Sequence, residues 1–397
     1  MDWLRILAGG NQPQAPVSAK RWVAHDGHGD LASAPHRAPT TREPRGATSM
    51  PNNSKIVTLD GSAGEGGGQI LRTALTLSML TGRSFRLTGV RANRSNPGLR
   101  PQHLMAVRAA ATLCNADVTG DSVGSADLTF RPGTLDPRDL DLDIGTAGST
   151  ALVLQTLHLP LATRSDRAVL LRLNGGTFNE AAPSEPFLLS TWKAHLDAIG
   201  LPIGLTSPRA GFYPRGSGRL DAWIEPGQPR AIVLDGRGPL TRITGIAGVA
   251  GLDRGIADRL KAQAEASLAD LGVEIDIRII EWQASSPGAA LSLTAHHGPD
   301  SIPATFVGLG RRGLPAESVA GDAVAQLLAF EARDGAVDSH SADQILLPLA
   351  LAEGRSIYNV TEVTGHLRTN AKTITAFLDR AIDIEEAGDG TGRVVIR

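Results

Sequence analysis

The sequence of 397 residues contains one cysteine, few aromatic residues and no long apolar run. A lone Cys114 cannot form a disulfide within the chain, and such sequences are typical of the reducing cytoplasm, where we expect this protein. No stretch approaches 18 consecutive apolar residues, so we expect neither a membrane-spanning helix nor a membrane partner. Aromatic residues make up 4% of the chain, so recognition of a nucleic acid would rest mainly on phosphate contacts.

Several catalytic motifs are also absent from the sequence. There is no CxxC or HExxH, which excludes the zinc and metalloprotease signatures that those motifs represent. Cys114 falls in an alanine-rich predicted helix, where we expect a core residue rather than a nucleophile. The net charge of −2 excludes a generally basic protein that coats nucleic acid.

Residues 1–53 differ in composition from the rest of the chain. They are rich in Pro, Ala, Gly, Arg and His and show neither strand nor helix periodicity. We expect them to be a disordered tail or an over-long start, with a second initiator at Met50. The remaining length exceeds what one core comfortably holds, so more than one compact unit is expected.

From Lys55 onward the pattern predicts one order of elements, β-α-β-α-β-β, that occurs three times. The first copy comprises strands over 55–60, 83–90, 117–121 and 127–133, with helices over 69–80 and 100–113. The second runs from 139 to 226, with helices after Gly145 and over 185–200. The third starts with the strand 231–238 and resumes with helices over 341–354 and 368–381. Gly61, Gly145 and Gly236 mark equivalent positions of an internal repeat.

The third copy is interrupted between its first strand and its first helix. The intervening residues predict strands over 241–248, 273–282, 289–295 and 304–309, and amphipathic helices over 257–271 and 316–332. We therefore predict an α+β fold built from α/β-type repeats. Residues 54–236 and 335–397 would form a large catalytic domain, and residues 237–334 a small inserted α/β domain.

A glycine-rich loop, Gly61–Gln69, lies between the first predicted strand and helix. Glycines and a helix N-terminus together favour anion binding, but no Lys-Ser/Thr follows, so this is not a P-loop. Glu65 within such a loop suits a hard metal ion on nucleotide phosphates. A tight turn with an exposed glutamate explains the pattern equally well.

A charge asymmetry follows this loop. Residues 66–116 contain no Asp or Glu and seven arginines: Arg72, Arg83, Arg86, Arg91, Arg94, Arg100 and Arg108. A guanidinium fork matches phosphate oxygens, so this composition favours a polyphosphate or nucleic-acid site over an ordinary solvated face. Arg72 follows the glycine loop by about one helical turn and is expected on the same side.

His366 stands out among the ten histidines because it occupies a strand-to-helix turn in the third copy. A neutral imidazole is a competent nucleophile toward phosphorus, and a helix N-terminus disfavours its protonation. A structural histidine is the alternative at this stage. Asp343 and Gln344, in the other helix of this copy, can hydrogen-bond a ribose or cap the helix.

These segments resemble the RNA 3'-terminal phosphate cyclase family. The matches are LDGSAGEGGGQILRTALTLS, RANRSNPGLRPQHL, GTAGSTALVLQT, NGGTFNEAAPSEPF, GFYPRGSG, SADQILLPLALA and HLRTN, in family order over about 55–397. The resemblance implies three repeated units with a small inserted domain. It also implies conversion of an RNA 3'-phosphate to a 2',3'-cyclic phosphate, with ATP consumed to AMP and diphosphate.

Site roles follow from the resemblance, residue by residue. His366 matches the nucleophile that becomes linked to AMP, and Arg72 and Glu65 complete the catalytic set. Glu65 matches a residue that helps to hold Mg²⁺ or Mn²⁺. The remaining matches are phosphate-contacting Arg91, Arg94, Gln102 and Gln155, and nucleotide-binding Pro183, Phe187, Asp343, Gln344 and His340, the last where the family often has an aromatic residue.

Two other functions are compatible with parts of this pattern. One is a non-catalytic relative that acts in ribosome biogenesis, a branch that lacks the nucleophilic histidine. The other is an enolpyruvyl transferase with a similar repeated architecture, in which the HLRTN turn would have no catalytic role. His366, Arg72 and Glu65 together favour the cyclase, whose partners would be ATP and an RNA with a 3'-phosphate end.

Overall fold

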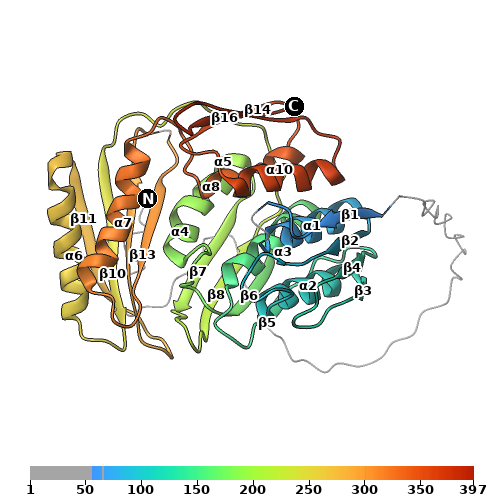
Figure 1. The fold of residues 1–397 in the computed structure, drawn as a ribbon, viewed down its shortest axis with the longest axis horizontal. Helices are drawn as coiled ribbons and strands as arrows, with labels where there is room; N and C mark the ends of the chain where they lie inside the picture. The colour runs from blue at the N-terminus through green and yellow to red at the C-terminus, as the bar shows by residue number, and fades with distance from the viewer. Residues whose placement is uncertain (1–55, 65–66, 300) are drawn as a thin grey trace, which may run out of the picture. The chain divides into compact units, whose positions relative to one another are not determined.

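The computed structural model describes residues 56–397 except 65, 66 and 300, and it shows a mixed α/β architecture of four-stranded sheets with packed helices (Figure 1). The predicted tail at residues 1–53 lies outside the described residues. Among the helices that the structure describes, none has the length and apolarity to cross a bilayer.

The first sheet has the order β1-β2-β4-β3. It consists of β1 (Val57–Asp60), β2 (Phe85–Thr88), β3 (Asp117–Thr119) and β4 (Leu128–Arg131), with helices α1 (Gln69–Thr81) and α2 (Pro101–Cys114). In β1 and β2 alternate residues are buried, as expected for strands that cover a core on one face. Cys114 ends α2 as a buried core residue, which confirms that prediction.

The second sheet has the order β5-β6-β8-β7. Its strands are β5 (Leu140–Asp143), β6 (Val169–Gly175), β7 (Ile203–Arg209) and β8 (Gly218–Ile224). Its helices are α3 (Thr150–Arg164), α4 (Glu185–Phe187) and α5 (Lys193–Ile199). The helix predicted over 185–200 is not one regular helix, because a π-helical turn, η2 (Leu188–Trp192), separates α4 from α5.

The third sheet, β15-β16-β14-β9, combines residues from two distant parts of the chain. It contains β9 (Val233–Leu234), β14 (Ser356–Val360), β15 (Ile382–Glu386) and β16 (Gly392–Ile396), with helices α8 (Ser341–Gln344), α9 (Leu346–Leu351) and α10 (Gly365–Phe377). The strand predicted over 231–238 shortens to two residues, and the helix predicted over 341–354 is split at Ile345. Pro348, inside α9, cannot donate a helical hydrogen bond.

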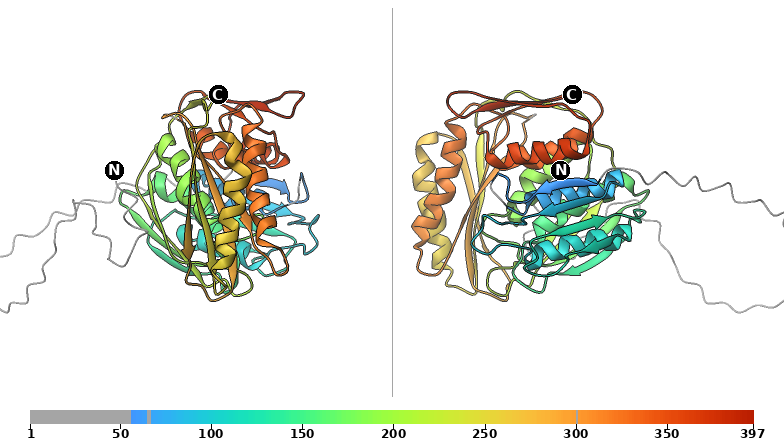
Figure 2. Two further views of the ribbon diagram at one scale, coloured as in Figure 1. Left: turned by 90° about the vertical axis from the view of Figure 1, so that its left-hand side faces the viewer. Right: turned by 45° about the vertical axis from the view of Figure 1, so that its right-hand side comes forward.

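The fourth sheet, β11-β10-β12-β13, belongs to the segment Arg242–Glu331. Its strands are β10 (Arg242–Ala250), β11 (Glu274–Glu281), β12 (Gly288–His296) and β13 (Ala304–Leu309). Helices α6 (Gly255–Leu268) and α7 (Ala316–Glu331) lie side by side on one face of this sheet, and a short 3₁₀ turn, η3 (Ala269–Leu271), follows α6 (Figures 1 and 2).

Two large apolar clusters hold these layers together. One continuous cluster includes buried residues of the first three sheets and of α1, α2, α3, α9 and α10, with α1 packed against α2, α3 and α10. A separate cluster lies between the β10–β13 sheet and helices α6 and α7. Helices from sequence-distant parts of the chain therefore share one core, which brings their N-terminal ends close to one another.

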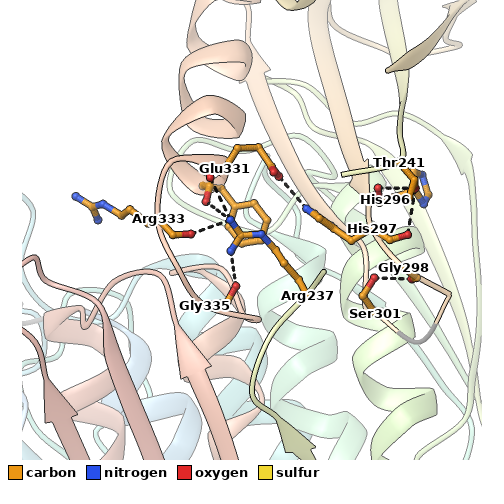
Figure 3. A network of polar contacts seen from close by, with 10 residues as sticks. Arg237, Thr241, His296, His297, Gly298, Ser301, Glu331, Arg333 and Gly335 are labelled. Atoms are coloured by element: carbon orange, nitrogen blue, oxygen red, sulfur yellow. Dashed lines mark hydrogen bonds and ion pairs between the residues drawn. The ribbon is translucent and has the colours of Figure 1, made fainter. Parts of the chain in front are cut away.

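Arg237 joins the two ends of the segment Arg242–Glu331 (Figure 3). Its guanidinium Nη2 donates to the carbonyl oxygens of Phe330 at 2.8 Å and Arg333 at 2.7 Å, and Nη1 donates to that of Gly335. Its Cζ also lies 4.2 Å from the centroid of the Phe330 ring. The last carbonyls of a helix lack partners within that helix, so one cation here satisfies several of them at the end of α7.

We predict that Arg237→Ala lowers the free energy of unfolding by about 2 kcal/mol, because several carbonyl groups lose a charged donor. Urea denaturation followed by circular dichroism would measure this change. The exposed Arg312, changed to Ala, is the control and should alter stability by less than about 0.5 kcal/mol. Equal effects of the two substitutions would contradict a structural role for Arg237.

Candidate active site

A cavity of about 730 Å³ is lined by the beginnings of α1, α8 and α10, by α3, and by the segment 179–187. Eight of the predicted site residues lie on its wall: Arg72, Gln155, Pro183, Phe187, His340, Asp343, Gln344 and His366. These residues come from positions that are up to 294 residues apart in the sequence (366 minus 72). The fold thus brings the catalytic and nucleotide-binding candidates together.

His366 lies in the first turn of α10. Thr364 caps this helix, since its Oγ1 accepts a hydrogen bond from the Leu367 amide at 3.1 Å, and the helix begins at Gly365. The prediction of a start at Arg368 is therefore wrong by three residues, because the capping threonine was overlooked. The helix N-terminus places a partial positive charge beside the imidazole and so disfavours its protonation.

A chain of hydrogen bonds fixes the orientation of His366. Its Nδ1 lies 3.0 Å from Oε1 of Gln69, whose Nε2 donates to Oδ2 of Asp343. The amide nitrogen of Gln69 thus faces the carboxylate, and its oxygen faces the ring. An amide oxygen can only accept, so Nδ1 of His366 carries the proton and, in the neutral ring, Nε2 carries the lone pair.

Arg72 lies next to this chain in α1. Burial lowers the pKa of its guanidinium to about 10, while the charge of Asp343 acts in the opposite direction. The side chain is therefore a desolvated cation at neutral pH, and its field acts in a medium of low dielectric constant. Asn370 supports the arrangement, since its Nδ2 donates to the Asp343 carbonyl at 2.7 Å and its Oδ1 accepts from Thr73 at 2.7 Å.

The glycine loop packs closely against the same side chains. A Cβ at Gly67 would lie 3.5 Å from Nη2 of Arg94 and 3.9 Å from Cε1 of His366. A Cβ at Gly68 would lie 3.0 Å from Nη1 of Arg72 and 2.3 Å from Nε2 of His103. Glycine is thus required at Gly68 by close approach, whereas Gly67 has room for a Cβ and borders both Arg94 and His366. Glu65 lies outside the described residues.

Arg91 lies in the predicted arginine loop with its backbone in the left-handed region, at a φ of 54°. Its Nη1 donates to the carbonyls of Asn96 at 2.6 Å and Gly98 at 3.2 Å. Burial lowers the pKa of Arg91, and the neighbouring Arg100 and Arg94 lower it further. Three guanidinium groups therefore lie close enough to repel one another, which a bound polyanion would relieve.

Gln102 connects α2 to the start of α3. It is not part of the cavity wall, and its Oε1 accepts a hydrogen bond from the amide of Ser149 at 2.8 Å. Ser149 is the N-cap of α3, so Gln102 ties α2 to the start of that helix. Arg91 and Arg94 are likewise absent from the wall residues, and Arg94 borders Gly67 of the glycine loop.

The nucleotide-binding candidates form another part of the wall. Gln155 donates to Oε1 of Gln344, whose own Nε2 donates to the carbonyl of His340 at 2.8 Å. Pro183 and the buried Phe187 supply apolar surface next to these amides. Amide groups beside an apolar wall form an environment suited to a planar heterocycle with polar edges.

Many wall residues are not among the predicted site residues. One is Gln69, which ends the glycine loop and begins α1, a position that could have marked it. Others lie on β13, where Thr305, Val307 and Leu309 line the cavity. Their spacing of two residues places them on one face of a strand. The sequence alone does not show that this face borders the cavity, because that depends on how the β10–β13 sheet packs.

Three buried histidines are neutral at pH 7. Burial lowers the pKa of His158 to about 3 and that of His195 to about 4. His103 also has a pKa of about 3, through burial and then through Arg72, Arg91 and Arg100. Within the described ranges, no group of three or more His, Cys, Asp or Glu side chains could hold a metal ion, so the metal prediction rests on Glu65 alone.

Comparison with known proteins identifies relatives that match most of the chain. A family profile described as RNA 3'-terminal phosphate cyclase matches residues 63–384. An RNA 3'-terminal phosphate cyclase of Methylococcus capsulatus is 41% identical over 350 residues, which cover 86% of this chain and 96% of that protein. Proteins of the same name from Salmonella agona and Ralstonia nicotianae are 40% and 42% identical, each over 84% of this chain and 95% of the relative.

The buried histidines predict a loss of stability in mild acid. Their folded-state pKa values lie below the unfolded value of about 6.5, so the unfolded state binds protons first as the pH falls below 6.5. Each histidine should then cost about 2 kcal/mol between pH 7 and pH 5. We predict that His158→Leu reduces this acid-dependent loss by about that amount, measured by urea denaturation at both pH values. An unchanged loss would contradict a depressed pKa for His158.

Proposed function

We propose a reaction for this chain, which belongs to the RNA 3'-terminal phosphate cyclase family and is therefore an enzyme of the ligase class. In this reaction an RNA 3'-phosphate becomes a 2',3'-cyclic phosphate, while ATP becomes AMP and diphosphate. The observation that carries the proposal is the chain of hydrogen bonds from His366 through Gln69 to Asp343, beside the buried cation of Arg72.

In the first step, Nε2 of His366 attacks the α-phosphorus of ATP. The bond between the α-phosphorus and the diphosphate oxygen breaks, and diphosphate leaves with the electron pair. The Nδ1 proton stays on the ring, where Gln69 accepts its hydrogen bond, and the carboxylate of Asp343 favours the positive charge that spreads over the substituted imidazole.

In the second step, an oxygen of the RNA 3'-phosphate attacks the same phosphorus and restores neutral His366. The RNA then ends in a phosphoanhydride to AMP. In the third step, the adjacent O2' attacks the RNA phosphorus, loses its proton and expels AMP. Covalent catalysis thus divides one difficult displacement into steps that each have a good leaving group.

The remaining side chains have binding and charge-stabilising roles in this scheme. Arg72 offsets the charge that develops on the phosphates, and Arg91 and Arg94 would bind further phosphate oxygens at the glycine loop. Pro183 and Phe187 would hold the adenine, with His340 at its edge. Asp343 and Gln344, which line the same cavity as Gln155, would bind the ribose together with it.

The described contacts of Gln102 limit its role, and Glu65 has a role as a metal ligand in this scheme. The amide oxygen of Gln102 is already bonded to the start of α3, so its amide nitrogen is the group that would reach a phosphate. Glu65 would help to hold Mg²⁺ or Mn²⁺, which would neutralise phosphate charge when bound. We assign the reaction to the cytoplasm because the chain has a single cysteine.

We also propose that the first three sheets are copies of one unit. In support, the strands of each lie in the same order, in which the first, second, fourth and third strands along the chain are neighbours, whereas the β10–β13 sheet has the order second, first, third, fourth. Residues 54–236 and 335–397 would then form the catalytic domain, and residues 237–334 the insertion. The separate apolar cluster of α6, α7 and β10–β13 supports that boundary.

The decisive experiment uses Mg²⁺ and ATP labelled at the α-phosphate. We predict an acid-labile, alkali-stable label on the protein that is absent from His366→Ala. Gln69→Leu should slow labelling about tenfold or more, since it removes a hydrogen bond that orients the ring. Gln228→Leu, at an exposed glutamine, is the matched control. Equal label on the wild type and His366→Ala would refute the mechanism.

A second prediction concerns the attacking oxygen of the RNA. An oligonucleotide with a 3'-phosphate on a 2'-deoxyribose should accept AMP but should not cyclise, because it lacks O2'. Gel analysis would show the adenylylated end accumulating, whereas normal RNA yields a phosphatase-resistant end. Cyclisation of the deoxy end would refute the role of O2'.

A further inference from the structure

Tyr213 is the most exposed of the large hydrophobic side chains that the structure describes. It is 81% exposed and lies in the loop Gly211–Ser217 between β7 and β8. An aromatic ring costs free energy when it stays in water, and aromatic residues are scarce in this chain. The proposed reaction, as derived above, does not use this residue.

The loop is held firmly although Tyr213 points to solvent. The neighbouring Phe212 is buried and stacks on Phe178 with 4.7 Å between ring centroids, and Trp282 packs against both. The amide of Arg215 donates to Oγ of Ser286 at 3.1 Å. The backbone that holds the exposed ring is thus already fixed, so the loop would lose little conformational entropy when a ligand binds to the ring.

The loop also borders the wall of the cavity. A Cβ at Gly216 would lie 2.6 Å from Cα of Ala147, so the two backbones are in contact. On its other side, the carbonyl of Ala147 accepts a hydrogen bond from Nδ2 of Asn179 at 2.6 Å, and Asn179 lines the cavity. Ala147 therefore lies between the loop and Asn179 of the cavity wall.

Two exposed arginines accompany Tyr213. Nη1 of Arg209 donates to the carbonyl of Ser217 at 3.3 Å, and neither Arg209 nor Arg215 forms an ion pair with an acidic side chain among the described residues. The nearby Arg219, in contrast, is paired with Asp221 at 2.7 Å. The cations beside Tyr213 are thus available to a polyanion.

We propose that the loop Gly211–Ser217 binds the RNA strand on the 5' side of its terminal nucleotide, with a base stacked on Tyr213 and phosphates at Arg209 and Arg215. An exposed ring flanked by cations is the arrangement by which proteins bind single strands without reading sequence. A protein partner would favour an interface core depleted in charged residues, whereas the exposed Arg209 and Arg215 belong to the same hairpin as Tyr213. The inference rests on the proposed function and adds a strand-binding surface to it.

The test compares two 3'-phosphorylated RNAs, a dinucleotide and a decanucleotide. Tyr213→Ala should raise KM for the decanucleotide about fivefold or more, which is the low end of what base stacking contributes. It should leave KM for the dinucleotide and the rate of labelling by ATP unchanged. Tyr213→Phe keeps the ring and should behave as the wild type. Val233→Ala, at a 58% exposed residue of β9, is the matched control.

The arginines are tested by salt dependence. The double variant Arg209→Gln and Arg215→Gln should reduce the slope of log affinity against log salt by about 1.4 for the decanucleotide, which corresponds to two phosphate contacts on a single strand. An unchanged KM for the decanucleotide in Tyr213→Ala, or equal increases for both RNAs, would overturn the proposal. If the wild type is neither labelled nor able to cyclise either RNA, the proposed function fails instead.

Discussion

The organisation of the site depends on one hydrogen-bonded chain, from His366 through Gln69 to Asp343, which joins the beginnings of α10, α1 and α8. A glutamine amide can connect a ring nitrogen to a carboxylate only in one orientation, so this chain determines which imidazole nitrogen is protonated. Arg72 and the glycine loop add charge and close backbone approach around the same point. The chemistry thus depends on the alignment of three helices that are distant in sequence.

Much of the fold could be predicted because apolar periodicity and glycine positions determine most elements locally. The strands over 57–60 and 304–309 and the helix from Gln69 follow directly from such patterns. The failures occurred where tertiary packing overrides the local pattern. The π-helical turn at Leu188–Trp192 and the division between α8 and α9 at Ile345 leave the apolar pattern intact, so periodicity could not reveal them.

The candidate site was predictable to the extent that its residues lie in recognisable motifs. Arg72, Asp343 and His366 were identified by motif and resemblance, and they line one cavity. Gln102 illustrates the limit of that approach, since the resemblance implies a phosphate contact for it, whereas its amide oxygen is bonded to the start of α3, a contact that no motif reveals. The wall formed by Thr305, Val307 and Leu309 lies in another sheet, and only the packing of that sheet beside the cavity makes these residues part of the site.

The contact made by Arg237 has a consequence for how the length of this chain can change. Residues 237 and 335 are 98 positions apart, yet one side chain joins them. The entropy of closing a loop grows only with the logarithm of its length, so doubling the intervening chain would cost about 0.6 kcal/mol. Because the junction is already closed, residues can be gained or lost at the surface turns between β10 and α7 with little effect on the rest of the molecule.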